Sequence, residues 1–383
     1  MDTSISGSDW AVFWLVAGSR LLLPLLIPRF PLPAILAALL LDGVDQTIFQ
    51  QFTSLPLDGY QGYDKALDIY YLSIAYISTL RNWADLFAVR LTRFLFYWRL
   101  VGVALFELTQ LRPLLLIFPN TFEYFFIFYE VCRLRWAPAR IGKKALLGAT
   151  AAIWIGIKLP QEYWIHILQA DTTDWLKANV FSVPLETPWS EIWASQPGPF
   201  VVALVVVILL VAAAWLLLSR YLPAADHAAA LSADAYQPAF TAEEVREAMD
   251  SEARSILDAA LGEKVVLIAL VSLSFAQVLP GVQASTLELA VGLGLVVIVN
   301  TALTHWLARR GFGWTLTLRR FVVMALVNGA MVFAYVALRD RLTTPFTAAS
   351  ALFFVLLLTL LVTLFDHYRQ VYLMRFEPRT ERI

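Results

Sequence analysis

The sequence predicts an all-α protein, a polytopic transmembrane bundle of about eleven helices, with ten to twelve as the range. Two observations predict this fold class. Of the 383 residues, 59% are hydrophobic and only 15% are charged, and the mean hydropathy is +0.66. Soluble domains average about 45–50% apolar and about 25% charged residues. Apolar stretches close to the roughly 20 residues that cross the hydrocarbon also recur along the whole chain.

Each predicted span is an apolar stretch bounded by polar or charged residues. The first 28 residues contain an acidic opening and an interrupting Arg20, which disfavour a cleavable signal peptide and favour a retained first span. The expected spans are 10–28, 31–50, 67–81, 94–110, 113–132, 145–161, 199–219, 265–280, 286–307, 321–338 and 346–365.

The distribution of Lys and Arg predicts the orientation. Basic residues next to a span are retained on the cytoplasmic side. With the N-terminus outside and the C-terminus inside, 21 of the 29 basic residues fall in inside segments and six in outside segments. We therefore expect an N-out, C-in protein that crosses the cell membrane, here a plasma membrane, several times.

Two polar segments divide the predicted spans. Residues 1–198 are expected to form a six-span bundle that ends in an extracytoplasmic, Trp-rich loop over 162–198, because Trp favours the membrane interface. Residues 199–383 are expected to form a five-span scaffold with a cytoplasmic amphipathic connector (221–264) and a short basic tail. Gly148, Ala152 and Gly156 predict a close helix contact through small residues.

The composition excludes several classes of function. The 29 basic residues nearly balance 30 acidic ones, so no nucleic-acid partner is expected. The single cysteine, Cys132, excludes an intramolecular disulfide and a cysteine metal cluster. The chain contains no Gly-rich phosphate loop, no HExxH and no GxSxG motif. No catalytic residue is therefore assigned, and no family resemblance is identified.

Ionisable residues are concentrated in the first six predicted spans. A charge at the bilayer centre costs about 2.5–3.5 kcal/mol, so these residues are expected to face a wet cavity or one another. We predict one acidic cavity that opens to the outside. The candidate substrate- or ion-binding residues are Arg20, Asp42, Asp45, Asp64, Asp68, Arg99, Glu107, Asn120, Glu123, Lys158, Glu162 and His166.

Spacing along the predicted helices supports this grouping. Asp42 and Asp45 are three residues apart and share a helical face, as do Asp64 and Asp68, which are four apart. Lys158, Glu162 and His166 also follow at intervals of four, provided that the helix continues past Pro160.

Simpler interpretations exist for several of these residues. Asp64 and Asp68 are also explained as caps at a helix start, where carboxylates complement the helix dipole. Arg20 with an acidic partner is equally explained as a structural pair. His166 is more simply an interfacial histidine than a metal ligand. Glu130, a further acidic residue of the predicted span 113–132, is best explained by an ion pair with Arg133.

Three functions remain open. The first is a transporter, coupled to a cation or protons, in which Asp42, Asp45 and Glu123 bind the ion and two arginines assist. The second is a membrane enzyme that acts on a lipid-linked substrate at the outer leaflet, with paired carboxylates as acid and base or as metal ligands. The third is a structural or assembly subunit. The expected partners are the bilayer and a lipid-linked or small ionic substrate, and the candidate cofactor is a divalent cation.

Overall fold

The computed structural model describes ten parts of the chain, and most of their residues are helical. They are residues 6–56, 60–137, 140–170, 172–221, 224–236, 259–278, 292, 294–303, 318–339 and 348–376. Within them, helices alternate with short turns and no β-strand occurs. The predicted all-α class is confirmed. The amphipathic part of the predicted connector, from residue 237 to 258, lies outside the described residues.

The chain divides into two compact units, which we describe separately. Unit 1 consists of residues 1–96 and 230–383, and unit 2 of residues 97–229. The predicted division at residue 198 stays a prediction.

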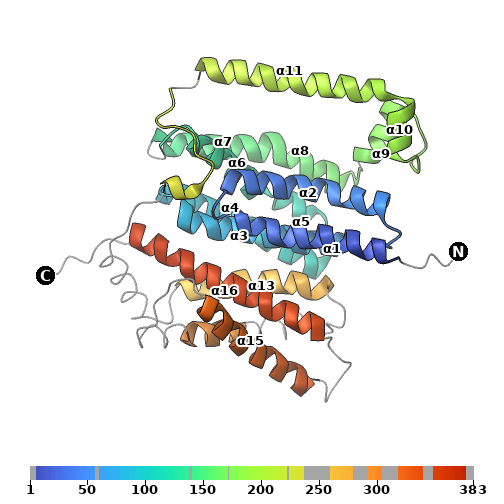
Figure 1. The fold of residues 1–383 in the computed structure, drawn as a ribbon. Helices are drawn as coiled ribbons and strands as arrows, with labels where there is room; N and C mark the ends of the chain where they lie inside the picture. Colours follow the sequence, from blue (N-terminus) through green and yellow to red (C-terminus); the bar gives the residue numbers. More distant parts are fainter. Residues whose placement is uncertain are drawn as a thin grey trace. The chain divides into compact units, whose positions relative to one another are not determined.

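Unit 1 begins with two antiparallel helices, α1 (Gly7–Leu22) and α2 (Pro31–Phe52), which lie side by side (Figure 1). Ser6 starts α1 through a capping box, since its hydroxyl accepts from Asp9 N and the Asp9 carboxylate accepts from Ser6 N. A short 3-10 helix, η1 (Leu23–Leu26), continues α1. Proline in the first turn of η1 and of α2 suits positions where no helical hydrogen bond is lost.

Helix α3 (Tyr60–Asn82) is the centre of unit 1. It packs against α1, α2, α13 (Ala259–Val278) and α16 (Ala348–Phe376). From Ala66 to Leu80 its side chains are buried, apart from Asp68. A helix covered by its neighbours does not need a fully apolar surface, which explains why this polar sequence forms a central helix. The helix begins seven residues before the predicted span.

The C-terminal helices of unit 1 contain a buried ion pair. They are α13, the helix Gly294–Leu303, α15 (Leu318–Arg339) and α16. Lys264 Nζ lies 2.5 Å from Asp366 Oδ1 and donates to Thr301 Oγ1 at 2.8 Å. Both charged side chains are at most 5% exposed. The sequence concentrates ionisable residues in the first six predicted spans, but this pair is also buried, because α16 extends eleven residues beyond the predicted span 346–365 and includes Asp366.

Unit 2 contains several short helices and one long helix, α11 (Pro197–Tyr221). Helix α4 (Leu86–Thr109) continues into this unit, which begins at Tyr97. The helices that follow are α5 (Pro113–Ile117), α6 (Thr121–Arg133), α7 (Lys143–Ile153), α8 (Leu159–Glu162), α9 (Thr172–Leu176), α10 (Trp189–Ser195) and α11. π-helical turns, η3 (Trp154–Lys158), η4 (Tyr163–Ile167) and η5 (Lys177–Phe181), follow α7, α8 and α9. The remaining short element, the 3-10 helix η6 (Ala233–Tyr236), belongs to unit 1.

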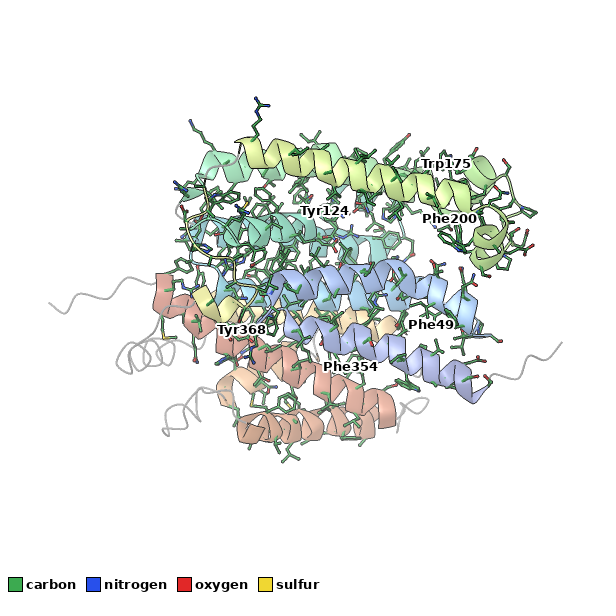
Figure 2. All side chains as sticks on the ribbon, turned by 45° about the horizontal axis from the view of Figure 1, so that its top comes forward. Phe49, Tyr124, Trp175, Phe200, Phe354 and Tyr368 are labelled. Carbon is green, nitrogen blue, oxygen red and sulfur yellow. The ribbon has the colours of Figure 1, made fainter. Side chains whose placement is uncertain are left out.

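Aromatic side chains gather where α10 meets α11. Trp189, Trp193 and Phe181 pack around Phe200, with ring centroids 4.8–6.1 Å from it. Figure 2 shows Phe200 and Trp175 at the same end of unit 2. This segment is the predicted Trp-rich loop, and it forms short helices.

Four helical segments are long and apolar enough to cross a membrane. They are Gly7–Leu26, Pro31–Phe52, Pro113–Arg133 and Ser350–Phe376, and α10 with α11 makes a fifth if this pair, bent by 94°, counts as one span. Four or five candidate spans among the described residues are fewer than the eleven predicted. The small-residue contact was wrong: Gly148 and Gly156 are exposed, and a side chain at either position would meet no atom of the described structure within 4 Å.

Candidate functional site

The first candidate site lies in unit 1 and is centred on Arg20. Helix α1 supplies Arg20, α2 supplies Asp42 and Asp45, and α3 supplies Asp64 and Asp68. The predicted spacings hold, because the two aspartates on each helix reach the same guanidinium. The arginine itself is only 5% exposed.

One guanidinium contacts all four carboxylates. Nη1 of Arg20 donates to Asp64 Oδ1 at 2.8 Å and also to Asp45. Nη2 donates to Asp68 Oδ1 at 3.0 Å and also to Asp42. When all four carboxylates are ionised, three negative charges remain without a cation from these five side chains.

Asp45 differs from the other three carboxylates. Its side chain is fully buried and also accepts a hydrogen bond from the Tyr60 hydroxyl. The other three side chains are 23–32% exposed. Tyr63 adds its ring beside the arginine, with Arg20 Cζ 5.9 Å from the ring centroid. Asp45 is therefore held between two partners, whereas the other three carboxylates face a more open side.

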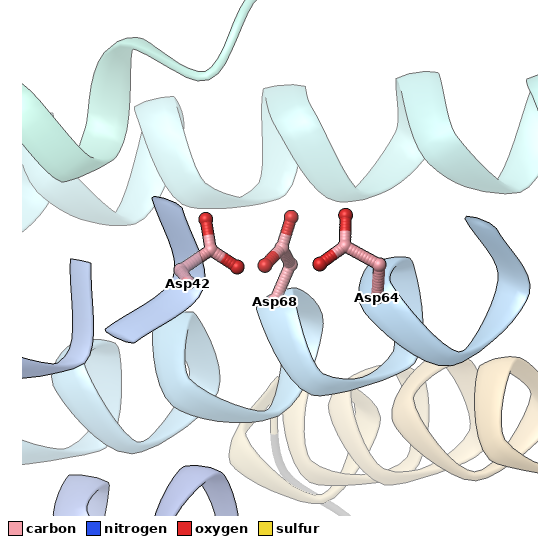
Figure 3. Close-up of side chains that lie close together, drawn as sticks. All are labelled: Asp42, Asp64 and Asp68. Carbon is pink, nitrogen blue, oxygen red and sulfur yellow. The ribbon is translucent and has the colours of Figure 1, made fainter. Parts of the chain in front are cut away.

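Those three carboxylates form a group that fits a metal ion. Figure 3 shows Asp42, Asp64 and Asp68 pointing toward one another from α2 and α3. One oxygen of each lies within 4.8 Å of the others. Carboxylate oxygens are the ligands that Mg²⁺ and Ca²⁺ prefer. The donor set therefore fits the divalent cation expected from the sequence.

The second candidate site lies in unit 2 and is centred on Glu162. His166 Nε2 lies 2.9 Å from Glu162 Oε2, Asn120 N donates to Glu162 Oε1 at 3.1 Å, and Arg99 Nη1 lies 3.7 Å from Oε1. The Glu162 side chain is 6% exposed. One buried carboxylate thus has three partners from three segments of the unit.

Glu123 stands beside this group. Asn120 Nδ2 donates to Glu123 Oε2 at 3.1 Å, and Lys158 Nζ lies 3.7 Å from the same oxygen. The Lys158 ammonium also stands 3.7 Å from the centroid of the Tyr124 ring, a cation–π contact. Figure 2 shows Tyr124 among the helices of unit 2.

The π-helical turns direct the polar residues inward. The helical run continues past Pro160, which stands in the first turn of α8. Lys158 and Glu162 are buried, whereas Ile155 and Ile165, on the neighbouring π-turns, are exposed. Such turns often occur at functional sites because they shift the register of a helix face. This register gives a polar inner face and an apolar outer face, as expected of a helix that faces lipid.

A glycine allows the close approach that orients Arg99. A Cβ at Gly102 would lie 2.1 Å from Phe118 Cβ, which no side chain tolerates. The Phe118 carbonyl accepts from Arg99 Nη1 at 3.2 Å. Gly102 on α4 therefore brings Phe118 near enough to fix the arginine that faces Glu162.

The remaining expectations have mixed outcomes. Glu130 pairs with Arg133 at 2.7 Å, as predicted. The side chain of Glu107 lies outside the described part of the structure. The structure brings the candidates together as two groups, one within each unit, and the prediction that they line one outward cavity stays a prediction.

Sequence reasoning missed several polar partners. Tyr60 and Tyr63 precede Asp64 on α3, and Tyr124 and Gln161 adjoin Glu123 and Glu162. A hydroxyl or amide that is next to a predicted carboxylate, or one helical turn before it as Tyr60 is before Asp64, is the signal that would have found them. The pair of Lys264 and Asp366 gives no such signal, since the two residues are far apart in the sequence.

In comparisons with models of protein families, with curated proteins and with solved structures, nothing matches this chain.

Proposed function

We propose that this protein is a multi-pass membrane transporter in which the Arg20 cluster binds a cation or protons that drive or accompany transport. The observation that carries the proposal is the excess of charge: four carboxylates share one guanidinium. Three like charges within a helix bundle repel one another and are poorly hydrated. A bound cation or protons supply the missing positive charge.

The position of Asp42 along α2 supports transport. Asp42 stands close to the middle of α2, a 22-residue apolar helix about 33 Å long. Secondary transporters bind their cargo and coupling ions near the bilayer midplane. In the proposed mechanism, Arg20 is the fixed counter-charge, Asp45 holds it in place, and the other three carboxylates exchange their ion.

The proposed topology is N-out and C-in with about eleven spans in a plasma membrane. We expect a cysteine introduced by Arg140→Cys to react with an impermeant maleimide only in permeabilised cells, and one introduced by Trp189→Cys to react in intact cells. Both variants are made with Cys132→Ser, so that the native thiol gives no signal. The reverse pattern of labelling would overturn the orientation.

Cation binding is the direct test of the site. Full-length protein in lipid nanodiscs is titrated with Na⁺, Mg²⁺, Ca²⁺ and Mn²⁺ by calorimetry in two buffers that differ in ionisation enthalpy, which counts the protons released. We expect one of these ions to bind with proton release. Asp68→Asn removes one ligand and is expected to weaken binding at least tenfold, whereas Glu186→Gln, at an exposed carboxylate, leaves it unchanged.

Transport is tested with the same ion. Proteoliposomes that contain a trapped pH indicator should show a change of internal pH when the ion is added outside, and liposomes with the Asp68→Asn variant should not. Two results would contradict the proposal. In the first, none of the four ions binds and the protein exchanges no protons between pH 5 and 8. In the second, an ion binds but is not transported.

A second candidate function rests on the other site. The 2.9 Å contact between His166 and Glu162 is the arrangement of a general acid–base pair. It favours an enzyme that acts on a lipid-linked substrate at the outer leaflet. His166→Gln would then abolish turnover of that substrate while leaving cation binding at the Arg20 cluster intact. If the protein is instead a structural or assembly subunit, the third function, neither Asp68→Asn nor His166→Gln is expected to change an activity.

A further inference from the structure

The site in unit 2 contains buried polar atoms that its own residues leave unused. Its charges are already compensated, because Glu162 faces His166 and Arg99, and Glu123 faces Lys158. An ionic ligand is therefore not needed to balance this site. What the site lacks is hydrogen-bond partners.

Two amide oxygens show the deficit. Asn120 directs its Nδ2 at the carboxylate of Glu123, which can only accept, so Asn120 Oδ1 must point the other way. The Gln161 side chain lies beside the Tyr124 hydroxyl. Asn120 Oδ1 and Gln161 Oε1 are buried and have no hydrogen-bond partner among the residues that the structure describes.

Two further groups of the same segments share this property. Thr121 Oγ1, on a residue that is 1% exposed, and Trp164 Nε1 are also buried without a partner in the described chain. Nearly all buried polar groups in folded proteins are paired, since each unpaired one is costly. The unused groups comprise two acceptors, one donor and one hydroxyl that can do either.

We propose that this site binds the neutral, hydroxyl-rich head group of a glycoside. A sugar hydroxyl both donates and accepts, so one head group can satisfy two amide oxygens and an indole N–H together. An ionised phosphate only accepts and an ammonium only donates, so neither matches the pattern. The aromatic ring of Trp164 offers an apolar face for the carbon side of a sugar ring. The inference does not depend on the Arg20 cluster, and it holds whether the ligand is carried or converted.

Thermal unfolding of the full-length protein in nanodiscs tests this ligand class. The probes are octyl glucoside, octyl galactoside and octyl mannoside below their micellar concentrations, with octyl phosphate and octyltrimethylammonium as charged counterparts of equal chain length. We expect at least one glycoside to raise the unfolding temperature in a saturable manner and neither charged amphiphile to do so.

Two variants connect the effect to the site. Gln161→Leu removes one unused oxygen, and Thr121→Val removes the unused hydroxyl while keeping the side-chain shape. Because that hydroxyl has no partner in the described chain, Thr121→Val is expected to fold as the parent does. Each variant is expected to weaken glycoside binding about tenfold, the worth of one hydrogen bond. Asn179→Leu, at an exposed amide elsewhere in unit 2, is the matched control.

Three results would overturn the proposal. The first is that none of the three glycosides raises the unfolding temperature, as expected if buried water satisfies these atoms. The second is that a charged amphiphile raises it instead. The third is that a glycoside raises it equally in the parent and in Thr121→Val. Glycoside binding without cation binding, or the reverse, separates this inference from the proposed transport function.

Discussion

Arg20→Met is expected to destabilise the protein more than any other single substitution in unit 1. The change leaves four carboxylates around a buried position with no cation among them. Removing one partner of a buried ion pair costs about 3–5 kcal/mol, because the remaining charge is uncompensated. We expect the purified variant to unfold at a clearly lower temperature than the parent, or to fail to accumulate in the membrane.

Companion variants separate charge from packing. Arg112→Met removes an exposed arginine of unit 2 and is expected to change stability by less than about 0.5 kcal/mol. Adding Asp42→Asn and Asp45→Asn to Arg20→Met removes two of the four orphaned charges and is expected to restore part of the loss. Arg20→Lys keeps the charge but not the fork of donors, and an intermediate effect follows. Equal stability of Arg20→Met and the parent would show that the cluster contributes nothing to the fold.

Asp45→Asn is expected to cause the second-largest loss of stability, whereas Asp68→Asn is expected to leave stability equal or higher. Asp45 is fully buried between Arg20 and the Tyr60 hydroxyl, and hydrogen bonds to a charged group contribute about 1.5–3 kcal/mol. The loss of the Asp45 charge is therefore expected to lower the free energy of unfolding by about 1.5–3 kcal/mol. Asp68 is 31% exposed and stands among like charges, so its neutralisation relieves repulsion and leaves stability equal or higher.

Denaturation of both variants in the same detergent provides the measurement. A structural role for Asp45 and an ion-binding role for Asp68 predict that only the first variant loses stability and that the second loses ion binding. If both variants lost stability equally, the four carboxylates would be a single structural cluster and the division between holding and exchanging groups would be wrong.

The sequence alone determined the class of fold and which aspartates of the first site share a helical face. The apolar content, the recurrent apolar stretches and the scarcity of charge predicted an all-α membrane protein. The spacings of three between Asp42 and Asp45, and of four between Asp64 and Asp68, placed each pair on one helical face because helix geometry is local. The cost of a charge in hydrocarbon then predicted that Arg20 and these carboxylates, like the other candidates, would face a wet cavity or one another.

The tertiary structure decided which partners meet. Arg20 comes from α1 and its four carboxylates from two other helices, and only the packing of the helices determines that one guanidinium reaches all four. The same holds for Lys264 and Asp366, which are 102 positions apart in the sequence and form a buried pair. The tertiary structure also groups the candidates within each unit. The physical reason is that hydrophobicity and helix periodicity act over neighbouring residues, whereas the choice of a counter-charge depends on which helix surfaces are buried together.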